Sequence, residues 1–304
     1  LDEAFDQFLA TADAGSRPPQ NRGGRDLGSI GYTSGTTGHP KGAMQSLESV
    51  LLNCAHTATM HGKVADDVIL SALPAAHVYG NVAINGTFLV GGTVVLMERF
   101  DAAAALELIS THGVTVFEGV PAMYSMLLAS DSIEQADLSS IRVSTVGGQT
   151  FSPVIIDKWE KLTGAPLLEL WGMTELSGLG TTHSVYAPPC PGSIGVSLPA
   201  TQIAIAPTDG ADGPVPPGEP GELIIRGPLV MLGYYGRPEA TAQALDADGW
   251  PTGAARVHID LSGERPLPDG SIVDSEGAIW NAQWNMGRVA RYLPNGRFDY
   301  AVEV

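Results

Sequence analysis

The apolar positions between residues 27 and 170 switch repeatedly between two spacings. Short apolar runs such as Leu27–Tyr32 and Val68–Leu73 are typical of buried strands, whereas the apolar residues from Leu47 to Ala58 recur at helical spacing. Further strands are expected at Val114–Phe117, Ile141–Val146 and Pro166–Leu170. This alternation predicts an α/β fold in which helices flank a largely parallel sheet.

Residues that favour helix ends mark two of the expected helices. Asp101 is placed to cap a helix that Gly113 ends. Ser152 and Pro153 open another helix, which Gly164 closes. The uncharged run Val78–Met97 is long enough to cross a membrane. Because it contains two asparagines and four glycines, we expect a buried helix, a Gly-Gly turn and a buried strand instead.

The amino-acid composition and the predicted secondary structure change at Pro188 and again near Trp250. After Pro188, proline and glycine are dense and short β runs appear at Thr201–Ala206 and Glu222–Arg226. After Trp250, four short β runs alternate with turns, as in an antiparallel meander. The sequence therefore predicts three parts: an α/β part over residues 1–187, a β-rich subdomain over 188–253 and a β-meander over 254–304.

Composition narrows the classes of partner. The chain has 304 residues and a net charge of −17, which argues against general binding to nucleic acids or anionic membranes. Its two cysteines, Cys54 and Cys190, cannot form a disulfide framework or a metal-binding spacing, and we expect small or inert thiols. Together these features predict a cytoplasmic protein. The chain does not begin with Met, so we expect it to start inside a longer protein.

The stretch YTSGTTGHPKG, residues 32–42, is rich in hydroxyls and glycines, carries one lysine and has no acid. It departs from the Walker A pattern, because Gly35 is followed five positions later by Pro40. Glycines let backbone N–H groups converge on an anion, and Lys41 adds a positive charge. We expect a strand–loop–helix unit that binds phosphate.

Ligands of parallel sheets bind beyond the carboxyl ends of the strands. Three loops are expected there: Thr33–Gly42, Gly147–Gln149 and Trp171–Glu175. These loops carry most of the candidate site.

Five motifs, in chain order, resemble those of the AMP-forming adenylating enzymes, the superfamily of acyl-CoA synthetases and luciferases. They are YTSGTTGHPKGA from Tyr32, LPAAHVYG from Leu73, STVGGQTFSP from Ser144, LELWGMTE from Leu168 and GELIIRGPLVMLGYYGRPEAT from Gly221. On these motifs, residues 1–253 are identified as part of a member of this family, incomplete at both ends.

The resemblance implies a ligase that converts a carboxylic acid and ATP to acyl-AMP, from which coenzyme A then displaces AMP. By resemblance, Thr174 binds the α-phosphate, Glu175 holds Mg²⁺, Lys41 contacts phosphate and His77 lies beside the acid. The other residues implied in nucleotide binding are Thr33, Ser34, Gly35, Thr36, Thr37, Gly38, Gly147, Gly148, Gln149, Trp171, Gly172 and Met173.

Each of these residues also fits a purely structural role. Thr174 and Glu175 suit a helix N-cap with an acid in the first turn. Trp171 suits either adenine stacking or core packing, and a lone His77 suits a structural contact. The acyl pocket is expected around His77–Asn85 and Gly147–Phe151, where no buried cation stands out. A fatty or other apolar monocarboxylic acid is therefore the expected substrate.

The resemblance stops after Gly253, where Ala254 stands in place of the aspartate that binds ribose in the family. The last lysine is Lys161, so no candidate exists for the lysine that the family's C-terminal domain supplies. Residues 256–304 resemble one blade of the SMP-30/gluconolactonase family, with Asp269 at the position of a metal ligand. We expect a join of two incomplete enzymes near Thr252–Arg256, either a fusion or an artefact.

Three functions stay open on the sequence alone. The first is an acid–CoA ligase acting in fatty acid metabolism. The second is a nucleotide-binding fragment without turnover, and the third is a lactone hydrolase. A single blade would leave strand edges open, so self-association through the meander is a further expectation.

Overall fold

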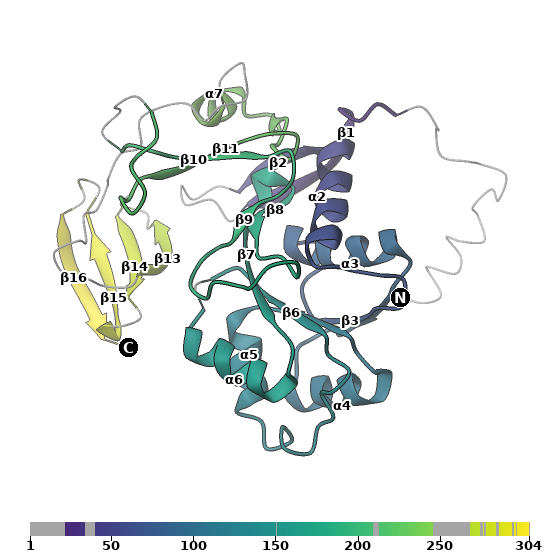
Figure 1. Ribbon diagram of the computed structural model, residues 1–304. Helices are drawn as coiled ribbons and strands as arrows, with labels where there is room; N and C mark the ends of the chain where they lie inside the picture. The colour runs from purple at the N-terminus through teal and green to yellow at the C-terminus, as the bar shows by residue number, and fades with distance from the viewer. Residues whose placement is uncertain are drawn as a thin grey trace, which may run out of the picture.

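The fold was analysed in a computed structural model, which describes residues 22–33, 40–149, 151–208, 213–245, 268–273, 276, 278–283, 286–293, 295 and 297–303. Its centre is a seven-stranded sheet in the order β4-β3-β5-β6-β7-β8-β9 (Figure 1). The first five strands in this order are parallel, whereas β8 pairs antiparallel with β7 and with β9. The strands are β3 Val68–Ser71, β4 Thr93–Leu96, β5 Val116–Gly119, β6 Val143–Val146, β7 Leu167–Met173, β8 Gly178–Thr182 and β9 Val196–Ser197. The predicted α/β class with a largely parallel sheet is confirmed.

Helices cover both faces of this sheet (Figure 1). One buried cluster joins Leu70 and Phe117 to α4, α5 and α6, and a second joins Leu170 to α2 and α3. Neighbouring strand residues such as Ile69 and Val116 belong to a third cluster, because successive side chains of a strand point to opposite faces. The helices are α2 Leu47–Met60, α3 Val78–Val90, α4 Ala102–His112, α5 Pro121–Leu128 and α6 Pro153–Thr163.

The predicted helix ends agree with the structure. The Asp101 carboxylate accepts a hydrogen bond from the Ala104 amide at 2.9 Å, and Gly113 ends α4 with φ at 58°. Gly164 ends α6 in the same left-handed conformation. The run Val78–Met97 forms helix α3, a turn at Gly91 with φ at 86°, and strand β4. Among the described residues, no helix is long and apolar enough to cross a membrane.

The hydroxyl-rich stretch belongs to a different sheet, and here the sequence prediction was wrong. Strands β1 (Leu27–Thr33) and β2 (Lys41–Ser46) form an antiparallel hairpin, and β12 (Gly233–Tyr234) pairs with the other edge of β2. A strand, not a helix, therefore follows the loop, and α2 begins only at Leu47. The sequence KGAMQS has weak intrinsic strand preference, so its pairing on both edges determines its conformation.

The third expected loop is also more regular than predicted. Strand β7 continues through Trp171, Gly172 and Met173, and a 3₁₀ turn, η1, covers Thr174–Leu176. Strand β8 pairs with this extension, so Trp171 and Thr181 lie opposite each other. Because β8 is a glycine-rich run, its strand character was not visible in the sequence.

The remaining elements are small. Strands β10 (Gln202–Ala206) and β11 (Glu222–Arg226) form a two-stranded antiparallel sheet, and α7 spans Pro238–Ala244. The C-terminal meander is a four-stranded antiparallel sheet of β13 Pro268–Val273, β14 Ile279–Gln283, β15 Arg288–Tyr292 and β16 Phe298–Glu303. The small antiparallel sheets agree with the predicted fold class. The exact division into three parts, and self-association through the meander, stay predictions.

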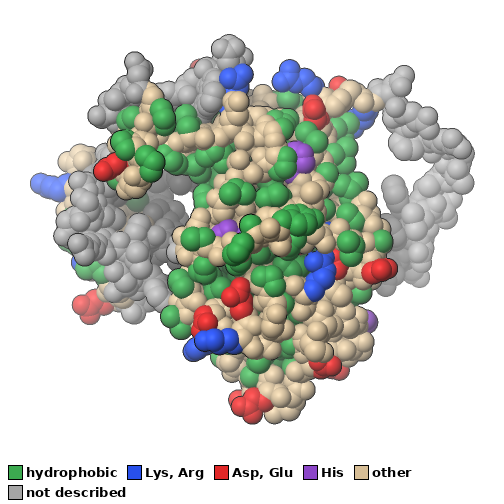
Figure 2. Space-filling view, viewed as in Figure 1, with side chains coloured by type: hydrophobic (Ala, Val, Ile, Leu, Met, Phe, Trp, Pro, Cys, Tyr) green, Lys and Arg blue, Asp and Glu red, His purple; other side chains and the backbone are tan. Residues whose placement is uncertain are grey.

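Neither the charged side chains of the surface nor the two cysteines form a distinct functional cluster in the described part of the chain. Figure 2 shows charged side chains of both signs scattered over one face of the molecule. Cys54 is buried and Cys190 is exposed, and both are free thiols. Burial raises the pKa of the Cys54 thiol to about 11, so it stays protonated near neutral pH.

Candidate functional site

The two ends of the phosphate-loop candidate lie directly opposite each other. Thr33 and Lys41 are a residue pair at the loop end of the β1–β2 hairpin, and both are half-buried. The other loop candidates fall outside the described residues; they are Ser34, Gly35, Thr36, Thr37 and Gly38. The described part of the hairpin therefore fixes where the loop starts and ends.

The hairpin is in direct contact with the turn that carries Thr174. The side-chain amide of Gln45 donates from Nε2 to the carbonyl oxygen of Thr174 at 2.9 Å. Gln45 in turn accepts a hydrogen bond from the Ser29 hydroxyl at 2.6 Å. On β1, a Cβ added to Gly31 would lie 2.5 Å from Cγ2 of Thr174, so only glycine leaves room for this side chain. The structure thus brings Thr174 beside the phosphate-loop candidate.

Glu175 is linked to Lys41 through a residue that the sequence analysis did not single out. The Tyr234 hydroxyl donates to Oε1 of Glu175 at 2.7 Å, and Nζ of Lys41 lies 4.9 Å from the centroid of the Tyr234 ring. Glu175 is half-buried. Within the described part of the chain, its Oε2 atom has no hydrogen-bond partner. A carboxylate with one oxygen fixed and the other available suits Mg²⁺, which is often bound through one or two carboxylates.

Buried polar residues of helix α2 form hydrogen bonds to the segment that follows Glu175. Asn53 donates from Nδ2 to the carbonyl oxygens of Leu176 and Leu179 at 3.1 and 2.9 Å, and its Oδ1 accepts from the Leu179 amide at 3.1 Å. Ser49 accepts a hydrogen bond from the Ser177 hydroxyl at 2.8 Å. The signal was present in the sequence as three polar residues at helical spacing, at positions 49, 53 and 57.

The adenine-loop candidates lie beside the end of β7. A Cβ added to Gly147 would lie 2.2 Å from Cδ1 of Leu170, and Gly148 has φ at 94°, which favours glycine. Gly148 and Gln149 are exposed. Trp171 is half-buried, and a Cβ on Gly180 would lie 2.9 Å from its ring. Stacking of Trp171 on adenine stays a prediction.

His77 lies at the same edge of the sheet, after the carboxyl end of β3. It is exposed and caps α3, because its Nδ1 accepts from the Tyr79 amide at 3.2 Å. The Tyr79 hydroxyl lies 2.7 Å from Oγ1 of Thr145 in β6, which ties the start of α3 to the strand that precedes Gly147. The structure therefore gives His77 a capping role, and its contact with the acid stays a prediction.

One buried lysine lies beside α3, in the region where the acyl pocket is expected. Nζ of Lys63 is fully buried and lies 3.2 Å from Oε1 of Glu118, with further contacts to Ala83 and Thr87 of α3. Sequence alone does not show which lysine is buried, because most lysines are exposed. Since Glu118 neutralises Lys63, the pair leaves no free positive charge for a second carboxylate of a substrate.

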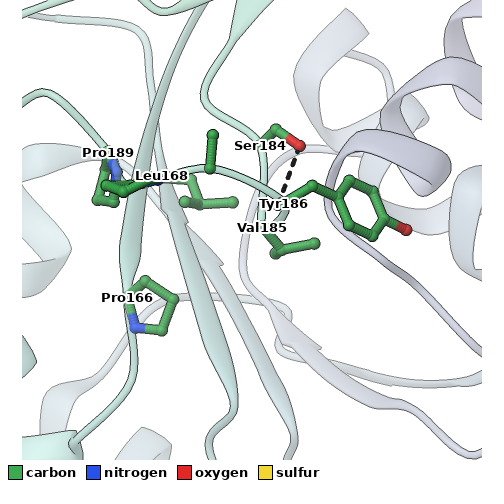
Figure 3. A pocket seen from close by; sticks show the side chains of 8 residues that line it. Pro166, Leu168, Ser184, Val185, Tyr186 and Pro189 are labelled. Carbon is green, nitrogen blue, oxygen red and sulfur yellow. Dashed lines mark hydrogen bonds between the residues drawn. The ribbon is translucent and has the colours of Figure 1, made fainter.

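A pocket of about 330 Å³ lies away from these residues (Figure 3). It is lined by Pro166, Leu168 and the segment from Ser184 to Pro189, without a charged side chain. Since Pro166 precedes β7 and Thr174 follows it, the pocket and the predicted site lie at opposite ends of that strand. The chemistry of the side chains favours the end that carries Thr174 and Glu175.

The side chain of the C-terminal metal-ligand candidate lies outside the described part of the structure. Asp269 lies in β13. Within the described ranges, no group of three or more His, Cys, Asp or Glu side chains could hold a metal ion.

Comparison with known proteins identifies two families along the chain. The family model "AMP-binding enzyme" matches residues 2–235, and that of the "SMP-30/Gluconolactonase/LRE-like region" matches 238–304. These matches meet earlier than the join expected near Thr252–Arg256. The chain is 36% identical over 228 residues to a long-chain-fatty-acid–CoA ligase of Bacillus subtilis, covering 74% of this chain and 40% of the relative. It is 39% identical over 224 residues to a feruloyl-CoA synthase of an Amycolatopsis species, covering 72% of this chain and 44% of the relative.

The chain is also similar in structure to a solved protein. ATP-bound MatB from Rhodopseudomonas palustris superposes with a TM-score of 0.73 at 27% identity, over 97% of this chain and 55% of MatB. The chain thus spans less than half the length of the two curated relatives named above. Because the first family model matches well over half of the chain, the chain belongs to the AMP-binding enzyme family.

Proposed function

We propose that this chain binds ATP and activates a carboxylic acid as acyl-AMP, with release of pyrophosphate, before coenzyme A displaces AMP. The observation that carries the proposal is the contact between the β1–β2 hairpin and the Thr174–Glu175 turn. A carboxylate oxygen is a poor leaving group, and its conversion to a phosphoanhydride removes that barrier. The protein's task is then to hold two anions together in the correct orientation.

The residues divide this task by their chemistry. Lys41 supplies positive charge at one end of the hairpin loop, and Thr33 supplies a hydroxyl at the other end. Thr174 supplies a hydroxyl for the α-phosphate on the facing turn, and Glu175 supplies a carboxylate for a metal there. Bound to Glu175, Mg²⁺ would supply charge neutralisation on the phosphate oxygens.

The adenine and the acid would occupy the edge next to this turn. Gly147 and Gly148 have no side chains to block close approach of a base. Gly147 packs against Leu170, and Trp171 is the next residue in the chain. The acid would lie near His77 and α3, a helix without any charged residue. We infer an apolar monocarboxylic acid. The relatives named for long-chain fatty acids and ferulate support an aliphatic or an aromatic tail equally.

The test is isotope exchange between ATP and pyrophosphate in the presence of a panel of fatty, aromatic and dicarboxylic acids. We expect exchange with apolar monocarboxylic acids. Thr174→Val should lower it at least about tenfold, because a hydrogen bond to a charged group is lost. Thr93→Val is the matched control, since Thr93 is exposed on β4. Exchange that is equal in wild type and Thr174→Val would contradict the assignment.

A second candidate is ATP binding without turnover. One sequence observation favours it: Ala254 stands in place of the expected aspartate. It predicts that ATP raises the melting temperature of the chain while exchange stays at background for every acid. The lactone-hydrolase alternative rests on the family match over residues 238–304, and the described residues there add no metal-binding group to it.

A further inference from the structure

The segment from Met231 to Tyr235 connects the two halves of the proposed nucleotide site. The Met231 amide donates to the carbonyl oxygen of Glu175 at 2.8 Å. The Leu232 and Tyr235 amides donate to the carbonyl oxygens of Met44 and Gly42 on β2, at 2.7 and 2.8 Å. One short stretch of backbone therefore fixes the hairpin strand and the Glu175 turn relative to each other.

Tyr234 adds a side-chain link inside this stretch. It is 8% exposed, its hydroxyl donates to Oε1 of Glu175 at 2.7 Å, and its ring faces Nζ of Lys41. A neutral phenol is a hydrogen-bond donor, so Tyr234 can hold Oε1 of Glu175 in one orientation.

We propose that Tyr234 is a positioning residue for nucleotide activation: it orients the Glu175 carboxylate so that Oε2 faces the metal site, and it holds Lys41 on the phosphate side through its ring. The inference rests on the proposed function. Without the phenol, the Glu175 carboxylate loses its fixed orientation and gains rotational freedom. Without the ring, Lys41 loses the surface that restricts its ammonium group.

The two contacts predict different defects. Tyr234→Phe removes only the hydrogen bond, so the Mg²⁺ concentration for half-maximal ATP binding should rise about tenfold, with little change at saturating Mg²⁺. Tyr234→Leu also removes the aromatic ring, so ATP affinity should fall severalfold even at saturating Mg²⁺. Tyr235→Phe is the matched control, because the neighbouring Tyr235 side chain is 59% exposed.

The experiment is calorimetric titration of the full chain with ATP at a series of Mg²⁺ concentrations. The four proteins are wild type, Tyr234→Phe, Tyr234→Leu and Tyr235→Phe. The same titration in a Glu175→Ala background tests whether Tyr234 acts through Glu175: there, Tyr234→Phe should produce no further shift in Mg²⁺ dependence. Urea unfolding of the single and double variants in metal-free buffer gives a readout that is independent of ligand, in which the two substitutions should be non-additive.

The possible outcomes distinguish failure of the Tyr234 role from failure of the proposed function. A tenfold shift that disappears in the Glu175→Ala background supports the positioning role. Equal Mg²⁺ dependence in wild type and Tyr234→Phe, with normal ATP binding, overturns the positioning role alone. A loss of affinity in Tyr234→Phe that is the same at every Mg²⁺ concentration assigns Tyr234 a merely structural role and also overturns it. Absence of ATP binding by wild type overturns the proposed function and this inference together.

Discussion

The side chain of Gln45 donates a hydrogen bond to the backbone of Thr174 across 2.9 Å, and these residues are 129 positions apart in the chain. Gln45 is buried on β2, and Thr174 begins the turn after β7. The contact joins the hairpin sheet to the central parallel sheet at the edge where parallel strands end. It brings two sequence motifs into contact.

Gln45→Leu should lower the free energy of unfolding by about 1–3 kcal/mol, because the carbonyl oxygen of Thr174 and the hydroxyl of Ser29 lose their partner. Urea denaturation measures this change. Gln202→Leu is the control, since Gln202 is exposed on β10, and it should change stability by less than about 0.5 kcal/mol. Equal effects of both substitutions would show that the Gln45 contact adds nothing specific.

Gly31→Ala should displace Thr174, because the new Cβ would lie 2.5 Å from Cγ2 of Thr174 and 2.9 Å from Nε2 of Gln45. We expect a loss of about 1–3 kcal/mol of stability from overpacking and a weaker rise in melting temperature on addition of ATP. Gly23→Ala is the matched control, with its nearest neighbour atom at 3.7 Å. An ATP-induced shift that is as large in Gly31→Ala as in wild type would contradict the packing argument.

Lys63→Met should lower the free energy of unfolding by about 3–5 kcal/mol, because it leaves the Glu118 carboxylate buried without its ionic partner. The exposed pair Lys161–Asp157, with a 2.7 Å contact, provides the comparison. Lys161→Met should cost no more than about 0.5 kcal/mol. The double variant Lys63→Met/Glu118→Leu should be more stable than Lys63→Met alone, and the reverse order would argue against an unpaired buried charge as the cause.

His61 should make the protein less stable in mild acid. Burial lowers the pKa of His61 to about 3, and the charges of Lys63 and Arg142 act in the same direction. The unfolded chain binds a proton at this histidine below about pH 6.5, whereas the folded chain does not, so the free energy of unfolding falls as pH drops below that value.

Between pH 7 and pH 5 the His61 contribution should be about 2 kcal/mol. Urea denaturation at these two pH values should therefore show a smaller pH effect in His61→Gln than in wild type. His112→Gln, at an exposed position at the end of α4, should retain the wild-type pH effect. A pH effect that is unchanged in His61→Gln would contradict a neutral buried imidazole.

The central sheet could be predicted because its residues obey local rules. Asp101 and Gly113 delimit α4 through their own backbone and capping preferences, and Leu70 and Ile69 lie on opposite faces because strand side chains alternate. These features need only neighbouring residues to be recognised. The predicted elements around them differ from the structure by one or two residues at most ends.

The hairpin and the site network could not be predicted in the same way. Strand β2 exists because β1 and β12 pair with it, and β12 is almost 190 positions further along the chain. Tyr234 has no property in the sequence that separates it from Tyr235, yet one is buried against Glu175 and the other is exposed. Contacts between distant segments determine such differences. The sequence motifs therefore identified the candidate residues, but the structure was needed to show how these residues are arranged.

The claim that the hairpin loop and the Thr174–Glu175 turn form one nucleotide site is tested most directly by a crystal structure of the chain with ATP and Mg²⁺. The account predicts the polyphosphate between residues 33–41 and the turn, with the α-phosphate within hydrogen-bond distance of Thr174. Nucleotide bound instead at the pocket beside Pro166, or no bound nucleotide at saturating ATP, would contradict it.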